Sequence, residues 1–356
     1  MVTSQVTSVL ARLAAVESSP LAFVQYELPM PDAPHRLHLS DLSSLRLFRR
    51  RLLRWYRLHK RDLPWRADRD PYRVWLAEIM LQQTRVAAVV EHYQRFLRRF
   101  PTLEALASAR SSSVLAAWSG LGYYRRARAL HEAAKKVVND HSSNIPATAE
   151  QLRTLPGVGR YTAAAIASIA FQEPVAVVDG NVERVLRRIF GKDLPGEKVW
   201  SAAEKLLSRT DPGDFNQAMM ELGATVCLPR QPQCLVCPVF PLCCTRGEGA
   251  RPEAEVRRRR AVQYELDLRD GAVLLVQRPR DSSLMPGMWE LPETHSSDGV
   301  PWLSLRHSIT VTDYLVKVTR ASASNTARGR WVRSSRLTTL PLTGLTRKIL
   351  RAAQLI

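Results

Sequence analysis

Four unequally spaced cysteines are the residues of this chain whose types most clearly predict chemistry. Cys227, Cys234, Cys237 and Cys243 follow the pattern C-x6-C-x2-C-x5-C. A structural zinc site usually pairs two short Cys-x-x-Cys segments, whereas only Cys234 and Cys237 form one here. The spacing therefore favours an iron–sulfur cluster over the alternatives, which are a zinc site or ordinary buried thiols. Cys244 lies outside the pattern.

Two carboxylates have surroundings that predict opposite charge states. Glu78 shares one helical stripe with Val74 and Leu81, so we expect burial to raise its pKa and keep it protonated, as a general acid requires. Asp179 follows the apolar run 175–178 and precedes an expected helix, whose dipole and N–H groups would keep it ionised. The alternatives are a paired surface glutamate and a purely structural helix cap.

A glycine-containing turn at residues 155–159, Leu-Pro-Gly-Val-Gly, separates two segments with helical periodicity. Gly157 and Gly159 permit a tight turn, and its backbone N–H groups, together with the start of the next helix, can bind phosphate. A generic turn without a ligand is the alternative.

The charge of the chain indicates a polyanionic partner. Its 52 Lys and Arg against 33 Asp and Glu give a formal net charge of +19, for which DNA is the simplest partner. With 356 residues, 45% of them hydrophobic, it can bury more than one core. It contains no apolar run long enough to span a bilayer and no secretory signal, so we expect a cytoplasmic protein with reduced thiols and no membrane contact.

Periodicity divides the chain into a helical part and a smaller part with strands. We expect a poorly ordered extension over 1–43, a helical domain over 44–226, the cysteine loop over 227–244, an exposed linker over 245–260 and a second domain over 261–356. The helical segments are 45–60, 70–90, 112–118, 125–140, 160–171, 180–190 and 215–222. Strands are expected at 262–268, 272–277, 314–319 and 329–332, with a hairpin turn at 269–271.

Several of these segments resemble the superfamily of endonuclease III and the MutY-type adenine DNA glycosylases. Residues 74–84, VWLAEIMLQQT, are similar to the catalytic helix of that family, and 178–182, VDGNV, to its second catalytic segment. Residues 155–159 resemble its helix-hairpin-helix, and the cysteine spacing resembles its [4Fe–4S] loop. The resemblance covers about 44–245 and implies a mainly α, helix-hairpin-helix glycosylase fold that carries a [4Fe–4S] cluster.

The resemblance also implies a mechanism in which the target adenine is flipped out of the duplex. Glu78 would protonate the base and Asp179 would stabilise the oxocarbenium character or a transient covalent intermediate. Tyr161 stands where the lyase relatives carry a Schiff-base lysine, which implies a monofunctional enzyme that leaves an abasic site. Further residues assigned by the resemblance are Asn181 as a partner of Tyr161 in organising the site, and Trp65, Arg66, Leu81 and Gln217 around the base.

Residues 121–124, Leu-Gly-Tyr-Tyr, resemble the wedge that this family inserts into DNA. The resemblance makes Gln83, Leu121 and Tyr123 enter or support the opened base stack. The alternative is that both tyrosines belong to the core, and for Tyr124 we favour it.

The C-terminal part resembles the Nudix-like domain with which adenine DNA glycosylases recognise 8-oxoguanine, through residues 274–279, 286–292 and 341–344. The acidic metal-binding helix of catalytic Nudix domains is absent, since the chain runs through 294–299 instead, so diphosphate hydrolysis is not expected. The Phe-Ser-His of the family's sensing loop is replaced by Ile309-Thr310-Val311. Either Thr310 or Ser308 is therefore expected to contact the lesion.

Together these features predict a monomeric adenine DNA glycosylase that acts on double-stranded DNA with A:8-oxoguanine or A:G mispairs. No metal takes part in the predicted chemistry. One alternative is a mismatch glycosylase with another base preference, which Gln82 and Gln83 disfavour. The other is a noncatalytic DNA-damage binding protein, which the presence of both Glu78 and Asp179 disfavours.

Overall fold

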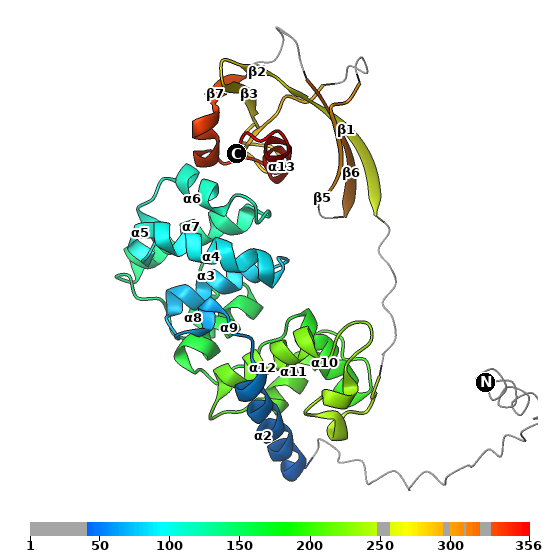
Figure 1. The fold of residues 1–356 in the computed structure, drawn as a ribbon. Coiled ribbons are helices and arrows are strands. Elements are labelled where there is room, and N and C mark those ends of the chain that lie inside the picture. The colour runs from blue at the N-terminus through cyan, green and yellow to red at the C-terminus, as the bar shows by residue number, and fades with distance from the viewer. Residues whose placement is uncertain (1–40, 248–256, 295–299, 310, 321–328) are drawn as a thin grey trace, which may run out of the picture. The chain divides into compact units, whose positions relative to one another are not determined.

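The computed structural model describes residues 41–247, 257–294, 300–309, 311–320 and 329–356. Most of the predicted extension and the middle of the predicted linker lie outside these residues. The mainly α fold is confirmed (Figure 1). The helices of the first part are α2 (Leu42–His59), α3 (Pro71–Leu81), α4 (Val86–Arg99), α5 (Leu103–Ala107), α6 (Ser111–Trp118), α7 (Arg125–Asp140), α8 (Ala149–Leu152), α9 (Arg160–Phe171), α10 (Gly180–Phe190), α11 (Glu197–Leu206) and α12 (Pro212–Thr225).

The single helix expected over 70–90 is wrong, because the chain breaks between α3 and α4. Asp70 caps the start of α3 as expected, but Gln82 leaves the helical conformation and Gln83 adopts a left-handed φ of 54°. No glycine or proline marks this break. The apolar spacing continues across it, since Leu81 and Val86 pack against the same core, and this explains why the periodicity suggested one helix.

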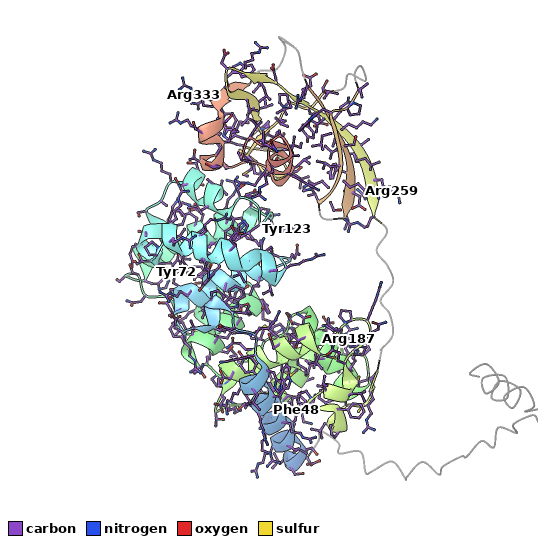
Figure 2. The ribbon with its side chains drawn as sticks, viewed as in Figure 1. Phe48, Tyr72, Tyr123, Arg187, Arg259 and Arg333 are labelled. Carbon is purple, nitrogen blue, oxygen red and sulfur yellow. The ribbon has the colours of Figure 1, made fainter. Side chains whose placement is uncertain are left out.

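The helical part contains two large apolar cores. The first lies among the helices from α3 to α9 and includes Trp75, Phe96 and Trp118. The second lies among α2, α10, α11 and α12 and includes Phe48 and Phe215, whose ring centroids are 6.3 Å apart. Figure 2 labels Phe48 in the second core and Tyr72 in the first. Tyr124 is 3% exposed and belongs to the first core, which confirms the alternative favoured for it.

The C-terminal part is smaller and combines strands with a helix, as expected. One sheet has the order β1-β6-β5, with β1 parallel to β6 and β5 antiparallel to it. In the other sheet β3 pairs with β2, β4 and β7. The elements are β1 (Arg258–Leu266), β2 (Leu268–Arg269), β3 (Ala272–Gln277), β4 (Trp289–Glu290), β5 (Leu303–Ile309), β6 (Thr312–Arg320), β7 (Arg330–Arg333) and α13 (Gly344–Ala352).

Two expectations for this part have different outcomes. The hairpin turn is confirmed, since Asp270 and Gly271 both have positive φ between β2 and β3. The linker expected up to residue 260 is wrong at its end, because β1 already begins at Arg258. Arg258 pairs with Thr312 of β6, a partner distant in sequence that no local pattern reveals. No helix among the described ranges is long and apolar enough to cross a membrane.

Candidate active site

A cavity of about 190 Å³ lies where α3, α9, α10 and α12 meet. The 3-10 turn η1 (Pro64–Arg66) and the residues after α3 also contribute to its wall. The structure brings eight of the predicted residues together on this one cavity. They are Glu78, Tyr161, Asp179 and Asn181, expected to act in catalysis, and Trp65, Arg66, Leu81 and Gln217, expected around the base.

Glu78 carries the strongest electrostatic signal of the cavity. Its side chain projects from α3 and is only 5% exposed. Burial raises the pKa of Glu78 to about 7, and the negative charge of Asp179 acts in the same direction. The hydrogen bond from Tyr161 and the positive charge of Arg66 oppose this rise. The hydroxyl of Tyr161 donates to Oε2 of Glu78 at 2.7 Å. Glu78 can therefore hold a proton near neutrality and release it to a bound group.

Asp179 is fixed as the N-cap of α10, which confirms the capping role considered for this residue. Its Oδ1 accepts from the backbone N–H of Val182 at 2.7 Å, and its Oδ2 accepts from Nδ2 of Asn181 at 3.0 Å. Asn181 is held in turn by Arg184, whose Nη2 donates to Oδ1 of Asn181 at 2.9 Å. Nε of Arg184 donates to the carbonyl of Cys227 at 2.9 Å, which links the capped carboxylate to the cysteine loop.

Glu221 is a cavity residue that the sequence reasoning missed. It is 1% exposed, and its Oε1 accepts from Nε of Arg61 at 2.7 Å while its Oε2 accepts from Nη2 of Arg66 at 2.8 Å. Burial opposes its charge, but the two arginines outweigh burial and lower the pKa of Glu221 to about 2. The sequence carries an indication of this role, because Glu221 follows Gln217 by one helical turn on α12 and therefore lies on the same face of that helix.

The predicted wedge residues lie outside the cavity and differ in exposure. Gln83 and Tyr123 are exposed, and both have left-handed backbone, with φ of 54° and 47°. Leu121 is 6% exposed and packs in the first helical core. The structure thus presents Gln83 and Tyr123 at the surface (Figure 2 labels Tyr123), whereas Leu121 is buried in the first core.

The hairpin before α9 requires only one of its two glycines. Gly157 has a φ of 74°, and a Cβ atom placed there would lie 2.4 Å from Cβ of Ala129. Gly159 is the N-cap of α9 with a φ of −85°, and a Cβ atom there would meet nothing within 4 Å. The tight approach to α7 therefore depends on Gly157.

The four predicted cysteine ligands line one small hollow together with Arg188. Nη1 of Arg188 lies 3.3 Å from Sγ of Cys227, which supplies positive charge beside a thiol. No three His, Cys, Asp or Glu side chains within the described ranges are arranged to hold a single metal ion. A [4Fe–4S] cluster makes a different demand, because its four thiolates bind four separate irons. The donor set fits such a cluster.

Of the two predicted lesion contacts, Ser308 lies in β5. Thr310 lies outside the described residues. Ser308 is engaged within its own hairpin, since its Oγ donates to Oδ1 of Asp313 at 2.6 Å. The same carboxylate is paired with Arg257 at 2.9 Å.

Comparisons with known proteins show which proteins the chain is similar to. The family model of the HhH-GPD superfamily base excision DNA repair proteins matches residues 76–209. The adenine DNA glycosylase of Rattus norvegicus is 51% identical, over 61% of this chain and 45% of its own, and the mouse protein is 42% identical, over 73% and 62%. The chain thus spans about half the length of these mammalian relatives.

A bacterial relative and one solved structure are covered almost completely. The adenine DNA glycosylase of Mycobacterium tuberculosis is 38% identical, over 78% of this chain and 88% of its own. The structure of a thermostable thymine-DNA glycosylase superposes with a TM-score of 0.54 at 32% identity, over 57% of this chain and 97% of that one. Because the similarity extends along nearly all of the mycobacterial protein, the chain belongs to the adenine DNA glycosylase family of helix-hairpin-helix base excision repair proteins.

Proposed function

We propose that this protein is a monofunctional DNA glycosylase that removes adenine mispaired with 8-oxoguanine or guanine and leaves an abasic site. The observation that carries the proposal is the buried Glu78, with its pKa of about 7, in one cavity with the helix-capping Asp179. Two carboxylates with such different surroundings suit the acid and the charge-stabilising roles of glycosidic bond cleavage. The net charge of +19 supports duplex DNA as the substrate. The protein is proposed to act as a monomer in the cytoplasm.

The reaction starts when the mispaired adenine leaves the base stack and enters the cavity, among Trp65, Arg66, Leu81 and Gln217. Glu78 donates its proton to the base as the C1′–N9 bond breaks, and the bonding electrons leave with the adenine. Asp179 stabilises the positive charge that develops on the sugar. Water then adds its hydroxyl to C1′, and its proton returns to the carboxylate of Glu78.

Tyr161 supports hydrolysis without strand cleavage. Its phenol is hydrogen-bonded to Glu78 and has no amine with which to form a Schiff base with the sugar. Sodium borohydride should therefore trap no covalent protein–DNA complex.

The four cysteines are proposed to hold a [4Fe–4S] cluster that orders the loop after α12 and takes no part in bond cleavage. The C-terminal part is proposed to act as a Nudix-like domain that contacts 8-oxoguanine through Thr310 or Ser308. In the free protein the hydroxyl of Ser308 donates its hydrogen bond to Asp313. Ser308 can therefore contact the lesion only if this hydrogen bond breaks.

Single-turnover release of the base tests the proposal on otherwise identical duplexes with A opposite 8-oxoguanine, A opposite G, A opposite T, and T opposite G. Alkali after each reaction reveals abasic sites. Fast release opposite 8-oxoguanine, slower release opposite G and none opposite T supports it. Equal rates opposite 8-oxoguanine and G would remove the lesion specificity.

A second candidate is a mismatch glycosylase that removes thymine, which the similarity to a thymine-DNA glycosylase structure favours. Release from the T:G duplex alone would establish it. Tight binding without release from any duplex would instead indicate a noncatalytic damage-binding protein.

A further inference from the structure

Arg126 lies in the first turn of α7 and reaches the end of the catalytic helix α3. Its Nη1 donates to the carbonyls of Ile79 at 2.8 Å, Met80 at 3.0 Å and Gln82. Its Nη2 donates to Oγ1 of Thr84 at 3.1 Å. Carbonyls at a helix C-terminus have no partner within the helix, so a cation placed here satisfies them and stabilises the end of α3.

The same guanidinium also holds the turn that precedes α7. Nη2 makes longer hydrogen bonds to the carbonyls of Leu121 at 3.4 Å and Gly122 at 3.3 Å. The guanidinium carbon lies 5.4 Å from the centre of the Trp118 ring and 5.5 Å from that of Tyr123. Arg126 thus contacts two separate turns, one after α3 and one before α7.

Each of these turns presents an exposed side chain on an unusual backbone. Gln83 directly follows Gln82, and Tyr123 directly follows Gly122, so each lies next to a carbonyl that Arg126 binds. Neither is a glycine, yet both have left-handed φ. Such conformations are strained and persist only where the surroundings enforce them.

We infer that Arg126 is a positioning residue that holds Gln83 and Tyr123 as one rigid pair of probes for opening the duplex. The inference rests on the proposed function and deepens it, because the pair would fill the space that the flipped adenine leaves. The planar fork of an arginine can donate to both turns at once. Lysine has three donors on one nitrogen and cannot span them in the same way.

The test uses the full chain with Glu78→Gln, which prevents cleavage, and 2-aminopurine in place of adenine opposite guanine. The fluorescence of 2-aminopurine rises when it leaves the stack. The added variants are Arg126→Lys and, as a matched control, Arg125→Lys, which makes the same substitution at the exposed neighbour on α7. Duplex affinity and the thermal midpoint are measured for each.

Arg126→Lys should lower the ratio of extruded to stacked base at saturating protein by about tenfold, as expected for the loss of one charge-assisted hydrogen bond. It should change the affinity for a fully paired duplex, in which no base is extruded, by less than about twofold. Arg125→Lys should change neither. A purely structural role would lower the thermal midpoint and the duplex affinity together. The inference is overturned if extrusion does not change, or if extrusion and duplex affinity fall by the same factor.

Two further results keep the test decisive. If Arg126→Lys does not fold, Thr84→Val removes one acceptor of the guanidinium, together with the 3.3 Å hydrogen bond from the Thr84 hydroxyl to the Gln82 carbonyl. It should lower extrusion by roughly threefold, less than one charge-assisted hydrogen bond is worth; no change would overturn the inference. If the Glu78→Gln parent binds the duplex but extrudes no base, the proposed function itself fails, and the role of Arg126 fails with it.

Discussion

The hydroxyl of Tyr161 donates a hydrogen bond of 2.7 Å to Glu78 and stabilises the charged form of a carboxyl that burial drives towards the neutral form. The balance leaves the pKa of Glu78 at about 7. If Glu78 acts as the acid, base release should fall as pH rises through about 7, by tenfold per pH unit beyond it, since only the protonated fraction reacts.

Tyr161→Phe should move this fall in the rate of base release to higher pH, because the carboxylate loses its hydrogen bond and the pKa of Glu78 rises further. The measurement is the single-turnover rate against pH for both proteins, with Glu78→Gln as the inactive control. A rate that falls at the same pH in both proteins would contradict the assignment of Glu78 as the acid.

Glu78→Gln should stabilise the fold at alkaline pH. The folded pKa of Glu78 is raised from 4.5 to about 7, so its contribution to stability is fully present below 4.5 and is lost as pH rises through about 7. Glutamine does not titrate. The free energy of unfolding of the variant should therefore rise relative to that of the wild type across this window, by up to about 3 kcal/mol. Urea unfolding at about pH 5.5, 6.5 and 8 checks the trend, and a difference independent of pH would argue against a buried, protonated Glu78.

The predictable part of the site consists of residues that local sequence marks. The apolar stripe predicts burial of Glu78 and the place before a helix predicts a capping Asp179, whereas their catalytic roles come from the family resemblance of residues 74–84 and 178–182. Glu221 and Arg126 act through partners far along the chain, namely Arg61 and the carbonyls that end α3. Such contacts leave no periodic pattern of residue types in the sequence. The pairing of β1 with β6 was missed for the same reason, since it joins strands that lie far apart in the sequence.

Glu221→Gln should destabilise the protein by about 3 kcal/mol at neutral pH, because it leaves the largely buried Arg66 without its ion pair. The pKa of Glu221 is lowered to about 2, so its contribution is present above 4.5 and is lost as pH falls through about 2. The matched control is Glu197→Gln, whose ion pair with Arg160 is exposed and should contribute less than about 1 kcal/mol. Equal effects of the two variants in urea unfolding would contradict the buried network.

Gly157→Ala should destabilise the hairpin by about 1–3 kcal/mol, because alanine is strained at the φ of 74° and its Cβ would lie 2.4 Å from Ala129. Duplex affinity should fall whatever the mispair, since the sequence predicts that this hairpin binds phosphate. Gly159→Ala is the control and should lower stability by less than about 1 kcal/mol, because nothing lies within 4 Å of the added atom and only the preference of the N-cap position against alanine is lost. Thermal unfolding and fluorescence anisotropy with an undamaged duplex measure both effects. An equal loss in the two variants would show that Gly157 has no special steric role.

Cys237→Ser should remove the visible absorption and most of the bound iron, because a four-iron cluster requires a thiolate for each iron. Cys244→Ser is the matched control, since Cys244 is exposed and lies outside the hollow that the other four cysteines line. It should retain both iron and colour. Because the cysteine loop is linked through Arg184 and Asn181 to Asp179, Cys237→Ser should also slow base release. Metal analysis of the wild type separates the alternatives: iron with visible absorption indicates the cluster, whereas one zinc per chain without colour would replace it by the zinc site.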